Sequence, residues 1–108
     1  MTFDEYQAEA RKTAIYPKEF GLGYVALGLS GEAGEVANKV KKVYRDGNGV
    51  LSLEDRHAIV EELGDLCWYC AMLCEELGVP FSAVAAGNVQ KLADRAKRNT
   101  LHGAGDNR

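Results

Sequence analysis

The sequence predicts an all-α protein, a bundle of four helices, and three observations favour this fold class. Apolar residues recur at the spacing of an amphipathic helix over two long segments. The alternation typical of a β-strand is missing, and the 108-residue chain contains only two prolines. Clusters of glycine, proline, aspartate and asparagine separate the segments, as turns between helices require. A chain of this length has room for one domain.

The first half of the chain predicts a short helix followed by a long one. The short helix is expected over Asp4–Thr13, and the turn around "YPKEFG" closes it. The long helix is expected from about Gly21 to Tyr44 and stops in "RDGNG", a strong turn signal.

The second half predicts another long helix and a shorter one. Ser52 begins a capping-box pattern that opens a helix over Leu53–Leu77, and a glycine and a proline then end it. Ser82 is expected to cap a fourth helix that ends near Asn99. The single domain therefore covers residues 1–99, and the glycine-rich tail beyond it is expected to be loose.

Composition and charge exclude several classes of protein. The net charge of −3 argues against a general binder of nucleic acid or of anionic membranes. No apolar run approaches the ~20 residues of a membrane span, and the charged N-terminus lacks the apolar core of a signal peptide, so we expect a cytoplasmic protein. Three cysteines lie within one predicted helix, which is typical of small apolar side chains rather than of a disulfide framework or a zinc site.

Each long helix carries a pair of carboxylates three residues apart, at the border of its apolar stripe. The second helix has Glu32 and Glu35, within "SGEAGEV", and the third has Glu62 and Asp65. The short loop between the two helices favours antiparallel packing, which would bring the two acidic borders together. The stripe of the third helix is made of Ile59, Leu63, Leu66, Cys70, Leu73 and Leu77.

Four carboxylates in one half-buried cleft would require protons or a cation. Two carboxylates 4 Å apart repel by about 4 kcal/mol at an effective dielectric near 20. Hard oxygen ligands without histidine suit Mg²⁺ or Mn²⁺, and Gly31 and Gly34 would let a backbone or a ligand approach closely. The alternative interpretation is that the acids are solvated helix faces, with Glu35 paired locally to Lys39.

These segments resemble a known enzyme family. "GLSGEAGEVANKVKK" followed by "EELGDLCWYCAMLCEELG" resembles the MazG-like nucleotide pyrophosphohydrolases, whose hallmark is E-x-x-E, a spacer, then E-x-x-D. Glu32 and Glu35 match the first half of that signature, and Glu62 and Asp65 match the second. The likeness extends to "FDEYQ" at the beginning and to "NVQKLADRAKR" and "GAGDNR" at the end, so it covers nearly the whole chain.

The resemblance implies an oligomeric all-α enzyme that hydrolyses nucleoside triphosphates between the α and β phosphates. The products would be a nucleoside monophosphate and pyrophosphate, and the physiological role would be housecleaning of the nucleotide pool. The four acids would be the catalytic residues and would hold Mg²⁺, which neutralises phosphate oxygens and activates water. Among them Glu35 is our choice of general base.

Phosphate charge that the metal leaves uncovered needs further polar and cationic groups. Four side chains share one face of the fourth helix, and arginine can grip a phosphate with two hydrogen bonds. They are Asn88, Lys91, Arg95 and Arg98. Lys39 is a lesser candidate, and the alternative for the whole set is a solvated basic face near a helix C-terminus. Within the tail, residues 100–108, the resemblance implies that three residues order over a nucleotide or a neighbouring subunit: Asp106, Asn107 and Arg108.

Aromatic residues near the acidic borders are candidates for contact with a base. Tyr69 lies in the acid-bearing row of the third helix and Tyr24 lies on the corresponding side of the second, although both positions also suit core packing. Trp68 points toward the polar side of its helix, so we expect it near a subunit contact. The resemblance implies a homodimer or homotetramer with a nucleoside triphosphate as substrate and no nucleic acid polymer or membrane as partner.

Two other functions compete with this hypothesis. Glu54 and His57 form one E-x-x-H fragment of a ferritin-like di-iron site, which needs two such motifs. The remaining alternative is a helical interaction module without enzymatic activity, in which the acids are merely solvated.

Overall fold

The computed structural model describes residues 1–108 and confirms the all-α prediction, with four α-helices and no strand. The helices are α1 (Phe3–Arg11), α2 (Gly21–Gly47), α3 (Leu53–Leu77) and α4 (Phe81–Lys97), and one 3₁₀ turn, η1 (Lys18–Phe20), precedes α2. None of the four helices alone has the length and apolar character that a membrane span needs; α3 and α4 reach them only as a bent pair.

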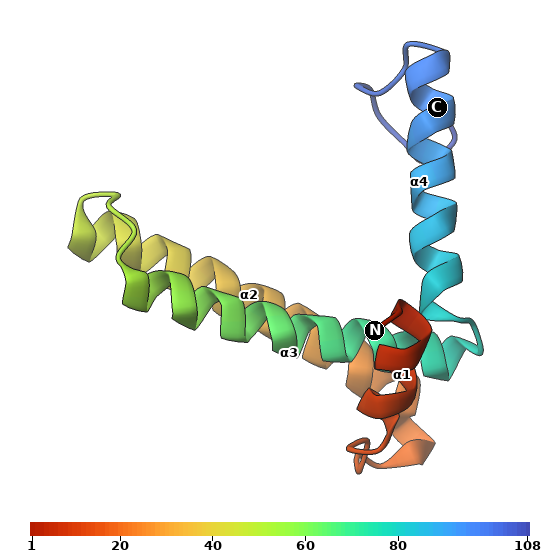
Figure 1. The fold of residues 1–108 in the computed structure, drawn as a ribbon, viewed down its shortest axis with the longest axis horizontal. Coiled ribbons are helices and arrows are strands. Elements are labelled where there is room, and N and C mark those ends of the chain that lie inside the picture. The colour runs from red at the N-terminus through yellow and green to blue at the C-terminus, as the bar shows by residue number, and fades with distance from the viewer.

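The two long helices, α2 and α3, lie side by side and antiparallel, as the short loop predicts (Figure 1). Ser52 Oγ accepts a hydrogen bond from the Asp55 amide at 3.0 Å, and the Asp55 carboxylate accepts one from the Ser52 amide at 3.2 Å, which confirms the capping box. Helix α2 runs three residues beyond Tyr44, because Asn48 takes a left-handed conformation (φ 54°) and ends the helix there.

Helix α1 packs across α3 near the C-terminal end of that helix (Figure 1). A small core of buried residues forms at this crossing: Ala10, Tyr16, Val25, Ala71 and Met72. Trp68 belongs to the edge of this core, since its Nε1 donates to Thr13 Oγ1 at 2.8 Å and to the Ala10 carbonyl at 3.2 Å. The polar side of α3 that carries Trp68 is therefore covered by α1, so its indole has an intramolecular partner and does not by itself require a subunit contact.

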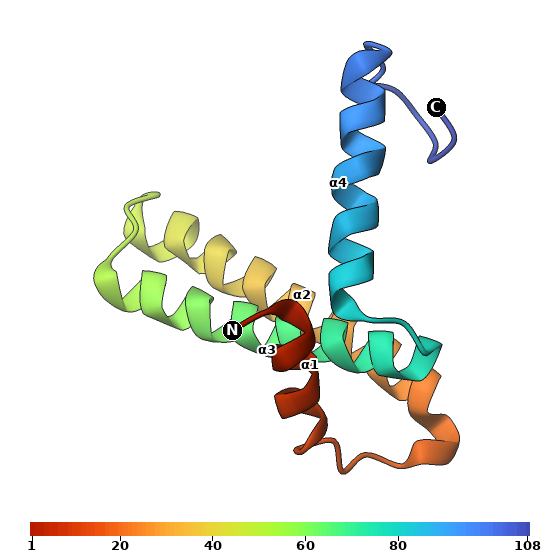
Figure 2. The same ribbon diagram turned by 45° about the vertical axis from the view of Figure 1, so that its right-hand side comes forward.

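Helix α4 leaves the pair of long helices at a bend of 100°, and Figures 1 and 2 both show it projecting away. Ser82 does not cap α4, contrary to the prediction, because the helix begins two residues earlier than a Ser82 cap requires, with Pro80 at its N-cap. Residues of α1 satisfy the first amides instead. Asp4 accepts from the Ser82 amide at 2.9 Å, and Gln7 accepts from the Phe81 amide at 2.7 Å. The predicted four-helix bundle is therefore incomplete within one chain, since α4 is held only at its beginning.

The single chain is more open than a folded domain of its length. Its radius of gyration is 16.8 Å, whereas about 13 Å is expected for 108 residues. Only 10 residues are buried, and the accessible surface is 7739 Å², against about 5,900 Å² for a compact monomer of this mass. About 1,800 Å² of additional surface is thus exposed, and it includes large apolar side chains on α2 and α4 such as Leu27 and Val89.

The tail folds back on the end of α4, in contrast to the loose segment expected from its composition. Arg95 is buried, and its guanidinium donates to the Asp106 carbonyl at 2.7 Å. The Arg108 guanidinium donates to three backbone carbonyls of residues 100–105. Hydrogen bonds from Arg95 and Arg108 therefore hold the glycine-rich tail in one conformation.

Candidate metal centre and nucleotide cleft

Three of the four paired carboxylates converge between α2 and α3. One oxygen each from Glu32, Glu62 and Asp65 lies within 4.8 Å of the others. Glu62 and Asp65 are one helical turn apart on α3, and the antiparallel packing places Glu32 of α2 opposite them. The carboxylate of Glu35 lies outside this group and is exposed to solvent.

Burial, mutual repulsion and one lysine together set the electrostatics of the cluster. Two ionised carboxylates 4.8 Å apart repel by about 3.5 kcal/mol at an effective dielectric of 20, and by less where solvent screens them. Burial first, then a hydrogen bond with Glu62 and the charges of neighbouring carboxylates, raises the pKa of Glu32 above its ordinary value of 4.5. Lys39 offsets part of the charge, with its Nζ 3.2 Å from Glu62 Oε1.

The donor set fits a hard divalent cation. The clustered ligand atoms are all carboxylate oxygens, and no histidine or cysteine belongs to the group. Mg²⁺ and Mn²⁺ prefer oxygen ligands of this kind, and bound Mg²⁺ usually completes its shell with water and substrate phosphates. Glu32, Glu62 and Asp65 are therefore the residues that could hold such an ion.

A cleft of about 370 Å³ opens beside the acids. Glu32 and Asp65 line one part of it, and Thr13, Trp68 and Tyr69 line the rest. The sequence does not predict Thr13 as a site residue, and it predicts Trp68 near a subunit contact. Both line the cleft because α1 packs on α3. The indole and phenol rings meet edge to face with centroids 5.0 Å apart, so the cleft combines an acidic floor with an aromatic wall.

The two tyrosines proposed for base contact have different surroundings. Tyr69 lies against the backbone of α2, where Gly28 leaves no room for a side chain. Burial first, then the proximity of Tyr24 and Glu32, raises the pKa of the Tyr69 phenol. Tyr24 is 44% exposed and stacks on Tyr16 with ring centroids 5.1 Å apart, so it lines no part of the acidic cleft.

The glycines of "SGEAGEV" have no close neighbour within the chain. A Cβ atom added at Gly31 or Gly34 would meet nothing within 4 Å. The close approach between elements occurs one turn earlier instead, where the Tyr69 ring lies on Gly28.

A single chain does not bring the basic face of α4 to the acids, because α4 bends by 100° from α3 and projects away from the two long helices (Figures 1 and 2). Two of the predicted cations bind the tail: Asp106 Oδ1 lies 3.4 Å from Lys91 Nζ and 3.5 Å from Arg95 Nη2. Arg98 pairs with Asp94 at 2.8 Å, within its own helix, and Asn88 is exposed.

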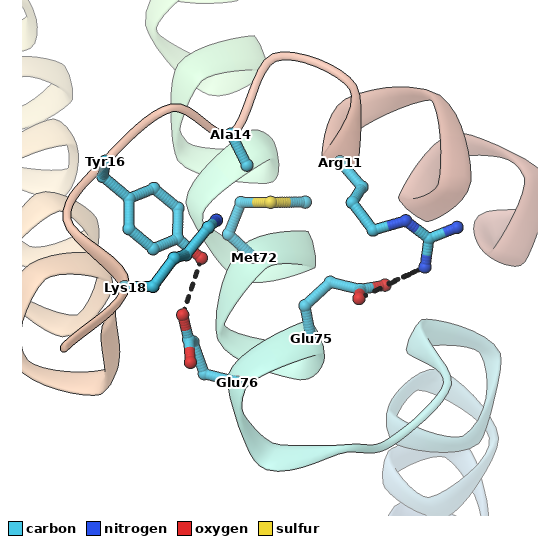
Figure 3. Close-up of a pocket in the computed structure, with 7 residues that line it drawn as sticks. All are labelled: Arg11, Ala14, Tyr16, Lys18, Met72, Glu75 and Glu76. Atoms are coloured by element: carbon cyan, nitrogen blue, oxygen red, sulfur yellow. Dashed lines mark hydrogen bonds and ion pairs between the residues drawn. The ribbon is translucent and has the colours of Figure 1, made fainter. Parts of the chain in front are cut away.

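A second pocket, of about 360 Å³, lies where the segment between α1 and α2 meets α3 (Figure 3). Its charged groups already bind one another. Arg11 pairs with Glu75 at 3.2 Å, and the Tyr16 hydroxyl donates to Glu76 at 2.8 Å. Lys18 lies 3.8 Å above the Tyr16 ring. These contacts attach the segment to α3, and we assign the pocket a structural role.

The remaining metal-binding candidates of the sequence are not assembled into a site. His57 pairs with Glu61 at 3.0 Å on the exposed side of α3, apart from the acidic cluster. The three cysteines are free thiols, and burial raises the pKa of Cys70 and of Cys74, as expected for side chains used in packing.

Comparison with known proteins agrees with the motif. The chain is 48% identical over 114 residues to the Gene 37 protein of Mycobacterium phage L5, and the alignment covers 100% of both chains. No solved structure matches this chain. The family model of the MazG nucleotide pyrophosphohydrolase domain matches residues 23–100. Because that match spans most of the chain and includes all four paired acids, the chain belongs to the MazG nucleotide pyrophosphohydrolase family.

Proposed function

We propose that this protein is a Mg²⁺-dependent hydrolase that converts nucleoside or deoxynucleoside triphosphates to monophosphates and pyrophosphate. The observation that carries the proposal is the convergence of Glu32, Glu62 and Asp65 from two helices beside a cleft with an aromatic wall. A divalent ion held by these acids supplies charge neutralisation at the phosphate oxygens.

Residues around the acids would activate the water molecule and bind the nucleotide base. Glu35 lies one turn beyond Glu32 and outside the cluster, so its carboxylate stays available as general base toward a water molecule. Tyr69 and Trp68 form the wall against which a base can stack. We therefore place Trp68 in the nucleotide cleft rather than at a subunit contact. Tyr24 is the weaker candidate for contact with the nucleotide base.

Association of subunits is part of this proposal. The surplus of about 1,800 Å² per chain amounts to about 3,600 Å² for two chains, which lies in the range of obligate homodimer interfaces. A homodimer or homotetramer would cover the apolar faces of α2 and α4. In such an assembly the polar face of α4 could reach the acids of another subunit, and Asp106, Asn107 and Arg108 would lie near that junction. The phosphate ligands from this face would be Asn88, Lys91, Arg95 and Arg98.

The experiment is a panel of common NTPs and dNTPs with Mg²⁺, in which the products are identified. Release of monophosphate and pyrophosphate is expected, and Asp65→Asn should lower the rate by at least about 100-fold, as loss of an electrostatic catalytic group does. Glu35→Gln should also lower the rate. Glu61→Gln is the matched control, since Glu61 is the exposed partner of His57 on the same helix. Release of diphosphate and orthophosphate would contradict the assigned bond, and full activity of Asp65→Asn would contradict the metal centre.

We further propose that the physiological role is housecleaning of the nucleotide pool, although adjustment of the dNTP supply would use the same chemistry. Housecleaning predicts that noncanonical triphosphates are hydrolysed with higher kcat/KM than the four common dNTPs. Equal or lower values would favour adjustment of the ordinary dNTP supply instead.

A further inference from the structure

Lys39 makes the only ion pair that joins α2 to α3. Its Nζ lies 3.2 Å from Oε1 of Glu62. The other ion pairs lie within one helix or between a helix and its own C-cap residue, between α1 and α3, or between α4 and the tail. Lys39 follows Glu32 by seven residues, which is about two helical turns and returns it to the same face. The i, i+4 spacing predicts Glu35 as its partner, but the structure directs it across to one of the three clustered acids.

Glu62 is therefore a carboxylate for which Lys39 and a bound metal ion would compete. A divalent ion held by the cluster would bind the Glu62 carboxylate. The ammonium group that now lies 3.2 Å from this carboxylate would then be repelled by the ion. The side chain of Glu62 is 16% exposed, whereas that of Lys39 is 33% exposed. Lysine is a flexible chain with a strongly hydrated ammonium, so it can exchange a carboxylate for water.

We propose that Lys39 is the counter-cation of the metal-free cleft and that the divalent ion displaces it from Glu62. This inference rests on the metal centre of the proposed function. Before the ion binds, the ammonium offsets the charge of one clustered carboxylate. After the exchange, the ammonium is free beside the acidic cluster, where the negative charge of a polyphosphate is expected. Metal loading would thereby release a cation for the substrate.

A different role for Lys39 predicts the opposite effect on metal binding. Glu62 has two oxygens, so Lys39 could remain on one of them and hold the other toward the ion. Removal of a positioning residue of that kind would weaken metal binding, whereas removal of a competing cation would strengthen it.

The test is a titration of the metal-free protein with Mn²⁺ alone. The paramagnetic ion should quench the fluorescence of Trp68, the only tryptophan, because the indole lines the same cleft as Glu32 and Asp65. Lys39→Met should bind Mn²⁺ about two- to fivefold more tightly than wild type, which is the worth of a partly exposed ion pair. Lys39→Arg, which can grip Glu62 with two hydrogen bonds, should bind Mn²⁺ no more tightly than wild type.

Lys41→Met is the matched control for the loss of one positive charge. Lys41 is exposed and lies two residues along α2, about 200° around the helix from Lys39. The affinity of Lys41→Met for Mn²⁺ should match that of wild type. Melting temperatures give a second readout: Lys39→Met should melt below wild type without metal and should gain more than wild type when Mn²⁺ is added.

The outcomes separate this inference from the function on which it rests. No Mn²⁺ binding by wild type would remove the proposed metal centre itself. Binding by wild type together with equal or weaker binding by Lys39→Met would overturn the exchange and leave the metal centre intact. An equal gain in Lys39→Met and Lys41→Met would also overturn it, because general charge would then explain the effect.

Discussion

Replacement of Gly28 by alanine tests the contact that fixes Tyr69 beside the acids. A Cβ atom at position 28 would lie 2.6 Å from Cδ1 of Tyr69 and closer still to the neighbouring ring atoms, so the ring would have to move. Alanine gains about 1 kcal/mol over glycine inside a helix, whereas overpacking of this kind costs about 1–3 kcal/mol. The net effect ranges from neutral to a destabilisation of about 2 kcal/mol.

Gly31→Ala is the control, because it gains the same helix propensity and meets no atom within 4 Å. It should be stabilised by about 1 kcal/mol, which raises the melting temperature by about 4–8 °C in a domain of this size. Thermal unfolding followed by circular dichroism, at equal protein concentrations, should place Gly28→Ala below Gly31→Ala. The emission of Trp68 should change only in Gly28→Ala, since the Tyr69 ring contacts the indole. If Gly28→Ala were stabilised as much as Gly31→Ala with unchanged emission, the close packing of Tyr69 on α2 would be refuted.

Three further predictions concern the core, the junction with α4 and the acidic cluster. Met72 is fully buried, so Met72→Ala should lower the free energy of unfolding by about 2–5 kcal/mol, whereas alanine at Ile15, which is 94% exposed, should change it by less than about 0.5 kcal/mol. Gln7→Leu removes the acceptor of the Phe81 amide and should lower the free energy of unfolding by about 1–3 kcal/mol. Hydrogen exchange of the Phe81 amide should become faster, and an unchanged rate would argue against this junction of α1 with α4. Burial first, then Glu62 and the nearby charges, raises the pKa of Glu32 above its ordinary value of 4.5. The stability that protonated Glu32 contributes to the metal-free fold is therefore fully present below pH 4.5 and is lost as the pH rises through the raised pKa. Denaturant titrations in EDTA should show this loss in wild type but not in Glu32→Gln, and Mn²⁺ should reverse the trend by competing with the proton.

Local physics made most of the secondary structure predictable. Helix α3 has the predicted limits because Ser52 and Gly78 act within one turn of the helix ends, through a capping box and a left-handed residue. Glu62 and Asp65 share a face because α-helical geometry places residues three apart side by side. The metal hypothesis followed from these short-range rules and from the likeness of the motif, and both depend on residues close in sequence.

Tertiary structure alone decided which of these groups meet. The convergence of Glu32 with two acids of α3, and the pairing of Lys39 with Glu62 rather than Glu35, depend on the relative rotation of two helices, which no spacing within one helix fixes. Trp68 reaches the cleft because α1 covers its side of α3, and α4 turns away because Asp4 and Gln7 hold its first amides. Such contacts join residues far apart in the chain, so their geometry is set by the packing of whole elements. The sequence by itself determined the helices and the acids, and the packing determined the cleft.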